Sequence, residues 1–234
     1  MHTSQDEFPL EWIGSSYKDP MQLPAKVRKF VGFALNFAQH GIQHSSAKVL
    51  KGFSGAGVLE VVENNAGGTY RTVYTVRFEE AVFAALLPEE EQERHRHAEG
   101  EGRHGRYPGA AQGGRGRSKG DGDMRTPVVN GIEVTTSSGN VFADLGLPNA
   151  DKLKVKSGLM IEITKAVRRL DLTQEEVGRR MGLPQPKVSA LLRGDFTNLS
   201  ERKLMDALNR LGYDIEITVR PTADPVGHLT LAIA

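Results

Sequence analysis

The stretch that most constrains the fold of this chain is residues 172–194, LTQEEVGRRMGLPQPKVSALLRG. Thr173 can cap a helix, and Glu176 three residues later completes a capping box. Gly182 suits a left-handed turn after that helix, and the prolines that follow it are tolerated in the first turn of a second helix. Apolar residues recur at helical spacing on both sides of the turn, namely Val177, Met181, Val188 and Leu191 or Leu192. The stretch therefore predicts two short helices joined at a sharp angle, the second ending at Gly194.

Two such helices form the helix-turn-helix geometry, which presents the start of the second helix to the major groove of DNA. The pattern Q-E-E-V-G-x-x-M-G-L-x-Q-x-K-V-S-x-L-x-x-G closely resembles the Xre (Cro/repressor-type) helix-turn-helix family. Glutamine can make paired hydrogen bonds to adenine, and lysine and arginine can reach guanine or phosphate. The DNA-facing positions that the resemblance implies are Gln174, Gln185, Pro186, Lys187, Ser189 and Arg193.

The sequence departs from that family at Pro184 and Pro186, where many members carry Ser or Thr. Hydroxyl contacts to DNA are therefore missing at these two positions. The alternative interpretation of the whole stretch is an amphipathic helical hairpin whose polar residues are only solvated. The agreement in spacing over so many positions favours the DNA-binding interpretation.

Composition limits the classes of protein that remain. A chain of 234 residues holds one or two domains, and a net charge of +1 means that any basic surface must be local. The absence of cysteine excludes a disulfide framework and a thiolate metal site. No apolar run is long enough to span a bilayer, and the first residues lack a signal-peptide core. We therefore expect a soluble, cytoplasmic protein with no membrane partner, no cofactor and no metal.

The first third of the chain predicts a helix followed by a small antiparallel sheet. Residues 23–40 place apolar side chains on one helical stripe, and Gly41 ends that stripe. Two runs of alternating residues flank a short loop that contains glycine, which predicts a hairpin. The predicted strands are 48–53, 58–65, 69–78 and 81–86.

At KVLKGFSGAGVLEVVEN…GTYRTVYTVRF the chain closely resembles HigB-type toxins, the phage-derived branch of the RelE-like ribosome-dependent endoribonucleases. The resemblance covers about residues 8–83. It implies mRNA cleavage in which positive charge balances the phosphate and a base activates the ribose 2′-OH. The toxin-like positions are Lys48, Lys51, Arg71, Tyr74 and Arg77. The alternative is that arginines alternating on one strand face are merely solvated.

After Phe83 the composition changes abruptly. Residues 86–123 contain few apolar residues and show no periodicity, which predicts a disordered linker. His95, His97 and His104 suggest a metal site, but the segment offers no further ligands at organised spacing. A solvated linker is the better interpretation.

The linker also has a genetic interpretation. One possible encoding of Leu87 to Gly100, read one nucleotide later, yields a lysine-rich sequence that looks like the continuation of a HigB-type toxin. We therefore interpret residues 86–123 as out of frame and residues 1–85 as a truncated, frameshifted toxin remnant. A small domain has little stability to spare, so this remnant is expected to be poorly packed and catalytically dead.

From Met124 the sequence VVNGIEVTTSSGNVFADLGLP looks like the flexible N-terminal arm of a HigA-like antitoxin, and we assign the arm to residues 124–150. A helix-turn-helix domain is predicted over 151–212. The alternation in 213–219 and 228–233 predicts two terminal strands within 213–234. Two strands alone do not make a stable sheet, so we expect them to pair across the two-fold axis of a homodimer.

The expected fold class is α+β: an N-terminal helix with an incomplete RelE-like antiparallel sheet, a disordered linker, and an all-α helix-turn-helix bundle with short terminal strands. The leading functional hypothesis is a DNA-binding antitoxin that represses its own toxin-antitoxin operon by binding double-stranded operator DNA. A rival hypothesis is a ribosome-dependent endoribonuclease toxin fused to its own antitoxin. A third is an interaction module whose arm binds an intact RelE- or HigB-like toxin from elsewhere.

Overall fold

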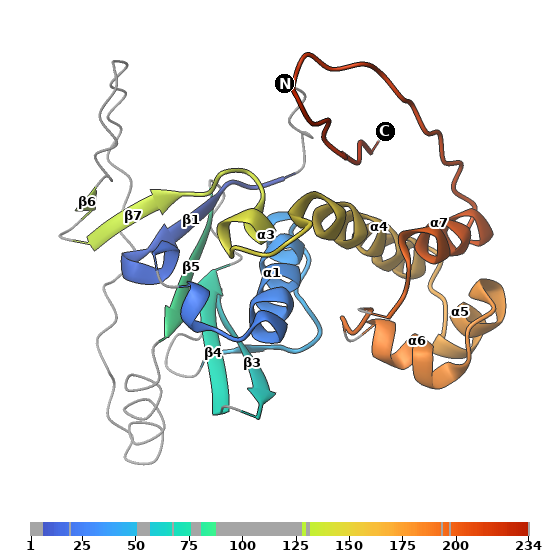
Figure 1. Ribbon diagram of the computed structural model, residues 1–234. Coiled ribbons are helices and arrows are strands. Elements are labelled where there is room, and N and C mark those ends of the chain that lie inside the picture. Colours follow the sequence, from blue (N-terminus) through green and yellow to red (C-terminus); the bar gives the residue numbers. More distant parts are fainter. Residues whose placement is uncertain are drawn as a thin grey trace.

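A mixed sheet and a helical bundle, joined by one long helix, make up the α+β fold (Figure 1). The computed structural model describes residues 7–18, 20–50, 57–66, 68–75, 81–87, 128–129, 132–192, 194–196 and 198–233. Residues 7–87 are called the N-terminal part below, and residues 132–233 the C-terminal part. The predicted linker lies largely outside the described residues, as do His95, His97 and His104.

Helix α1 (Ala25–Gln39) lies against one face of the sheet and contributes more core side chains than any other element of the N-terminal part. Its apolar residues recur every three or four positions, but every residue from Val31 to Gln39 is buried, so the second half of the helix is covered on all sides. Gly41, which the sequence predicts to end the helix, follows it with a φ of +68°. The buried residues of the predicted stripe are Val27, Val31, Ala34, Phe37 and Ala38.

Within the described ranges, seven strands form the sheet in the order β2-β3-β4-β5-β1-β7-β6. Strands β3 and β4 form the predicted hairpin, with Asn65 paired to Gly68 at its turn. Strand β1 runs parallel to β5 and antiparallel to β7. Two short 3₁₀ turns, Gly14–Tyr17 and Pro20–Gln22, lead from β1 to α1. The strand bounds are β1 (Leu10–Ile13), β2 (Ala47–Val49), β3 (Val58–Asn65), β4 (Gly68–Thr75), β5 (Val82–Leu87), β6 (Val128–Val129) and β7 (Ile132–Thr136).

The structure corrects two expectations about the N-terminal part. The domain boundary after residue 85 falls inside β5, because Leu86 and Leu87 continue the ladder with β4. The N-terminal part is also well packed among its described residues, with Trp12 and Tyr74 each only 1% exposed. The reason is that the C-terminal part supplies apolar cover that the isolated remnant would lack.

The arm, which we expected to be flexible, is a strand and a short helix docked on the N-terminal part. Strand β7 pairs with β1 from Val134 to Thr136, so backbone groups that β1 would otherwise expose at the edge of the sheet gain partners. Helix α3 (Val141–Asp144) follows, capped by the Asn140 side chain, which accepts from the N–H of Phe142 at 3.1 Å. Phe142 lies over Gly32, where a Cβ would meet the ring at 2.8 Å.

Helix α4 (Ala150–Arg169) connects the arm to the helix-turn-helix, which consists of α5 (Gln174–Met181) and α6 (Gln185–Leu192). Helix α7 (Glu201–Arg210) packs back onto α4, and Ser200 caps its start, because the Ser200 hydroxyl accepts from the N–H of Lys203 at 3.3 Å. One apolar core runs through both parts of the chain. The ring of Phe33 lies 5.1 Å from that of Phe142 and 4.3 Å from that of Phe196.

The two terminal strands predicted at 213–219 and 228–233 are absent, since residues 213–233 form neither helix nor strand. This tail leaves α7 and returns in an extended path toward α4 (Figure 1). Ile217 and Val219 are 74% and 91% exposed. A strand needs backbone partners, and the described part of this single chain places none beside the segment. No helix in the described ranges has the length and apolarity needed to cross a membrane.

Candidate nucleic-acid interface

The start of α5 is held by the predicted capping box. The Thr173 hydroxyl accepts from the N–H of Glu176 at 3.3 Å, and a Glu176 carboxylate oxygen accepts from the N–H of Thr173 at 3.1 Å. Two hydrogen bonds from Thr173 lower the pKa of Glu176; the bond from its backbone N–H has the larger effect, and the bond from its hydroxyl the smaller. The carboxylate also lies in the first turn, where negative charge is favourable. Hydrogen bonds between residues of the first turn therefore fix the position at which the helix-turn-helix begins.

Close backbone packing defines the turn between α5 and α6. Gly182 adopts a left-handed conformation with a φ of +67°, and its N–H donates to the carbonyl of Gly178. A Cβ at Gly178 would lie 2.9 Å from the Leu183 carbonyl oxygen. The carbonyl of Pro184 accepts from the N–H groups of Lys187 and Val188 at 2.8 and 3.1 Å, which closes the first turn of α6. The crossing of the two helices therefore depends on two glycines and on a proline placed just before the second helix.

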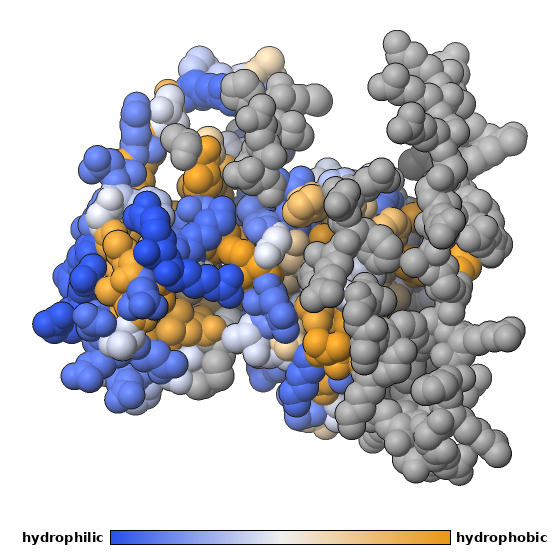
Figure 2. All heavy atoms as spheres, turned by 180° about the vertical axis from the view of Figure 1, so that it is seen from behind, coloured by the Kyte–Doolittle hydropathy of each residue, from blue (hydrophilic) through white to orange (hydrophobic). Residues whose placement is uncertain are grey.

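The two helices bury one side and expose the other. Val177 and Val188 are fully buried where α5 and α6 cross. Gln185, Pro186 and Lys187 are exposed in the first turn of α6, and Gln174 is exposed at the start of α5. Hydrophilic residues dominate this end of the molecule in Figure 2. We call Gln174, Gln185, Pro186 and Lys187 the reading face.

The other two predicted DNA-facing positions are not among the exposed residues that the structure describes. Ser189 is half-buried and already engaged in an interaction within the protein. Arg193 lies outside the described residues. The four residues of the reading face are thus the predicted positions that the structure leaves open to solvent.

The three toxin-like residues that the structure describes do not lie together on one open surface. Lys48 is exposed on strand β2, whereas Tyr74 is buried in the core, and burial raises the pKa of its hydroxyl. The guanidinium of Arg71 donates to the carboxylate of Glu60 at 2.8 Å, with the two side chains only 16% and 12% exposed. Because Arg71 and Tyr74 are three apart on one strand, they point to opposite faces of the sheet.

Lys51 and Arg77, the other two toxin-like positions, lie outside the described residues.

Sequence reasoning missed the surface on which the arm docks. The indole N–H of Trp12 donates to the Asp144 carboxylate at 3.1 Å. The guanidinium of Arg28 donates to the carbonyls of Leu145 and Gly146 at 2.8 and 3.0 Å, at the end of α3. Gly32, placed in the middle of an apolar helical stripe, was the sequence signal that another element approaches closely there.

His44 anchors the end of α6 to the N-terminal part. Its ring is 1% exposed and lies edge-on to Phe30 and Phe37, at centroid distances of 5.4 and 5.7 Å. Its Nδ1 accepts from the N–H of Ser46 at 3.2 Å, whereas Nε2 has no partner and leaves no room for a Cβ at Gly194. Burial lowers the pKa of His44 to about 4. The ring is therefore neutral and fills space at the base of the helix-turn-helix.

Comparison with known proteins agrees with this division of the chain. Residues 141–220 match the family model of a helix-turn-helix domain. Residues 18–87 match that of a phage derived protein, Gp49-like. A solved structure titled a putative XRE family transcriptional regulator is 30% identical, with a TM-score of 0.34; the match covers 37% of this chain and 98% of that one. No curated protein matches the chain.

The C-terminal part is thus a helix-turn-helix domain of the DNA-binding class. The helix-turn-helix match and the Gp49-like match are consistent with the expected Xre-type helix-turn-helix and with a toxin-like N-terminal part.

Proposed function

We propose that this protein is a sequence-specific DNA-binding antitoxin that represses its own toxin-antitoxin operon, and that its toxin-like part is inactive. The observation that carries the proposal is the reading face, in which Gln185 and Lys187 are exposed at the start of a helix whose opposite side is fully buried. Amide and ammonium groups in that place suit base edges and phosphates in the major groove.

The state of the toxin-like residues supports an inactive N-terminal part. A ribonuclease of this kind needs a positive group free to balance the charge that develops on phosphate. Arg71 already neutralises Glu60, and the Tyr74 hydroxyl lies in the core. The rival hypothesis, an active endoribonuclease fused to its inhibitor, predicts translation-dependent mRNA cleavage by the full chain. Our proposal predicts none.

The docked arm bears on the choice of toxin partner. The edge of β1 and the surface around Gly32 are filled by β7 and Phe142 of the same chain. The arm is therefore already engaged, and we expect an intact toxin from elsewhere to compete poorly for it. The docking of the arm within its own chain therefore disfavours the third hypothesis, in which the arm is free to bind a foreign toxin.

Operator binding by the full chain tests the proposal. Gln185→Ala and Lys187→Ala should each weaken binding to a palindromic promoter fragment by about 1–3 kcal/mol, because each removes one base or phosphate contact. Both residues are exposed, so the unfolding midpoints should not change. Lys152→Ala, which removes an exposed lysine from α4, is the matched control and should bind like the wild type.

The affinities should be measured at several salt concentrations, since a phosphate contact also contributes to the salt slope. Lys187→Ala should reduce that slope by about one unit, whereas Gln185→Ala should leave it unchanged. Wild-type affinity in both variants would remove them from the reading face. Absence of any salt-dependent DNA binding by the wild type would contradict the proposed function itself.

A further inference from the structure

The C-terminal tail contacts the rest of the described chain at its two ends. At its start, the guanidinium of Arg169 lies over the ring of Tyr213, 5.1 Å from its centroid. At its end, Leu231 packs against the apolar core. Between these ends every residue from 216 to 227 is exposed, and no backbone hydrogen bond joins this connecting segment to another part of the described chain. The end of the tail is therefore held by its own contacts and not by the segment that leads to it.

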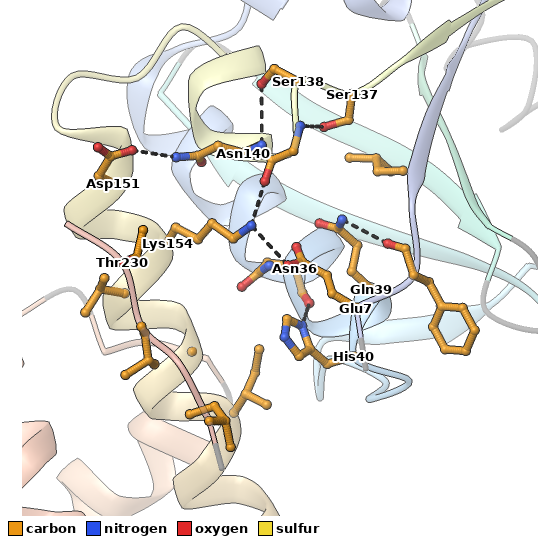
Figure 3. A pocket seen from close by; sticks show the side chains of 18 of the residues that line it. Glu7, Asn36, Gln39, His40, Ser137, Ser138, Asn140, Asp151, Lys154 and Thr230 are labelled. Carbon is orange, nitrogen blue, oxygen red and sulfur yellow. Dashed lines mark hydrogen bonds and ion pairs between the residues drawn. The ribbon is translucent and has the colours of Figure 1, made fainter. Parts of the chain in front are cut away.

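The end of the tail docks in a groove on α4. Leu231 fits against Gly158, where a Cβ would lie 2.7 Å from the leucine side chain, so the helix has a notch at this glycine. The His228 ring lies 3.3 Å from the carboxylate of Asp151, near the start of the same helix. Figure 3 shows the tail passing along this part of α4, with Thr230 and Asp151 labelled. The tail residues that line the adjoining cavity of about 630 Å³ are His228, Leu229, Thr230, Leu231 and Ile233.

These contacts are the same whether the tail belongs to the same chain or to a second copy. Within one chain, the connecting segment keeps the end of the tail near its own groove at an effective concentration of about millimolar. An exchange between two copies therefore requires an additional gain. The connecting segment supplies it, because Ile217 and Val219 are 74% and 91% exposed and become buried where the segments of two copies lie side by side.

The lengths of the segments allow this exchange. Antiparallel pairing of residues 213–219 about a two-fold axis places Val219 of one copy beside Tyr213 of the other. Tyr213 lies against the end of α4, and the notch at Gly158 is about 17 Å back along that helix. Residues 219–231 span about 40 Å when extended, so the tail of one copy reaches the groove of the other.

We propose that two copies of this chain exchange their C-terminal tails. Leu231 of each copy fills the notch at Gly158 of the other, and His228 of each copy reaches Asp151 of the other. The second copy thereby supplies one wall of the cavity. Because α4 leads directly into the helix-turn-helix, the exchange joins two helix-turn-helix domains in one assembly. It does so whether or not DNA is bound, so it does not rest on the proposed function.

Disulfide trapping in the full chain tests the exchange, because the sequence contains no cysteine. Two chains of different tagged mass, one with Gly158→Cys and one with Leu231→Cys, are mixed in mild urea, returned to buffer and oxidised at micromolar concentration. Each chain then has one cysteine, so the pair joins efficiently only where the tail of one copy lies in the groove of the other. We expect the covalent heterodimer at its statistical yield.

Val226→Cys, in the exposed connecting segment, replaces Leu231→Cys in the matched control and should give several-fold less heterodimer. A chain that carries both Gly158→Cys and Leu231→Cys should form a covalent dimer. Closure of that disulfide within single chains, together with no heterodimer from the mixed chains, would overturn the proposal even if the wild type is dimeric by other contacts.

Sedimentation of two alanine variants provides a test that needs no cysteine. Gly158→Ala places a methyl group where the Leu231 side chain lies and should weaken dimerisation about tenfold. Alanine favours a helix more than glycine does, so the loss cannot come from α4 itself. Leu231→Ala removes the side chain that meets this methyl group, so Gly158→Ala should have little further effect in its presence. Unchanged dimerisation in Gly158→Ala, or additive losses in the double variant, would contradict the exchange.

Discussion

His44 is a single residue on which the fit between the two parts of the chain depends. It lies in the N-terminal part, between Phe30 and Phe37, and its far side contacts the backbone at Gly194. An unpartnered nitrogen in such a place is tolerated only while the ring is neutral. Protonation would introduce a buried charge at the end of α6, so the stability of this contact depends on pH.

We predict an acid-side loss of stability that arises from His44. In the unfolded chain its pKa is about 6.5, and in the folded protein burial lowers the pKa to about 4. Between these values the unfolded state binds more protons, so stability is complete above pH 6.5 and falls as the pH drops toward 4. At pH 5 the loss should be about 2 kcal/mol relative to pH 7.

The measurement is urea unfolding of the wild type and of His44→Leu at both pH values. Other groups titrate in both proteins. The informative quantity is therefore the difference in the free energy of unfolding between the wild type and the variant, compared at the two pH values. The advantage of the wild type over His44→Leu should shrink by about 2 kcal/mol on going from pH 7 to pH 5. A difference that stays constant would show that His44 is not buried as a neutral ring.

At the scale of elements, the arm adds a strand to the sheet of the N-terminal part and a helix against α1. Strand β7 extends the sheet beyond β1, and α3 places Phe142 against α1. Charged contacts at the rim, such as Lys18 with Glu133 at 2.6 Å, are exposed and contribute little. Apolar burial and backbone pairing therefore supply most of the docking energy.

Phe142→Ala should destabilise the full chain by about 3–5 kcal/mol, the usual cost of removing a buried phenylalanine ring. The variant should also become sensitive to protease within residues 132–147, because the arm loses its main anchor. Phe8→Ala removes a ring that is 39% exposed and should have a much smaller effect. Unfolding by denaturant and limited proteolysis report the two effects separately. Equal stability of the two variants would mean that the arm is not held by Phe142.

At the scale of the whole molecule, the tail carries apolar residues that a single chain leaves uncovered. Ile217 and Val219 alternate with polar residues on an extended segment that pairs with no strand among the described residues. A two-fold axis beside 213–219 would give each copy the strand partner that it lacks, and would match the palindromic sites that helix-turn-helix dimers read. We therefore expect a homodimer in which this segment becomes a strand.

Ile217→Lys places a charge in that pairing and should yield monomers that no longer bind the operator cooperatively. Light scattering at micromolar concentration measures the mass, and the wild type should give twice the mass of one chain. Thr218→Lys changes the neighbouring residue, on the other side of the extended segment, and serves as the control that should stay dimeric. A monomeric wild type would exclude this assembly.

Local chemistry is what the sequence by itself determined. The Thr173 capping box, the left-handed Gly182 and the β3–β4 hairpin each depend on residues within a few positions of one another, so their patterns were readable without a structure. The exposure of Gln185 and Lys187 followed from the same helical periodicity that buries Val188.

Contacts between distant residues were decided only by the tertiary structure. Trp12 and Asp144 are 132 positions apart, and no local pattern predicts that one donates to the other. The same holds for the arm, whose alternation suits a strand but does not say which edge it joins. Tyr74 and His44 were readable as polar residues, yet their burial depends on α1 and on Gly194. In the tail, a local pattern was present but the predicted element did not form. Alternation in 213–219 creates a strand only where a partner strand is within hydrogen-bonding reach.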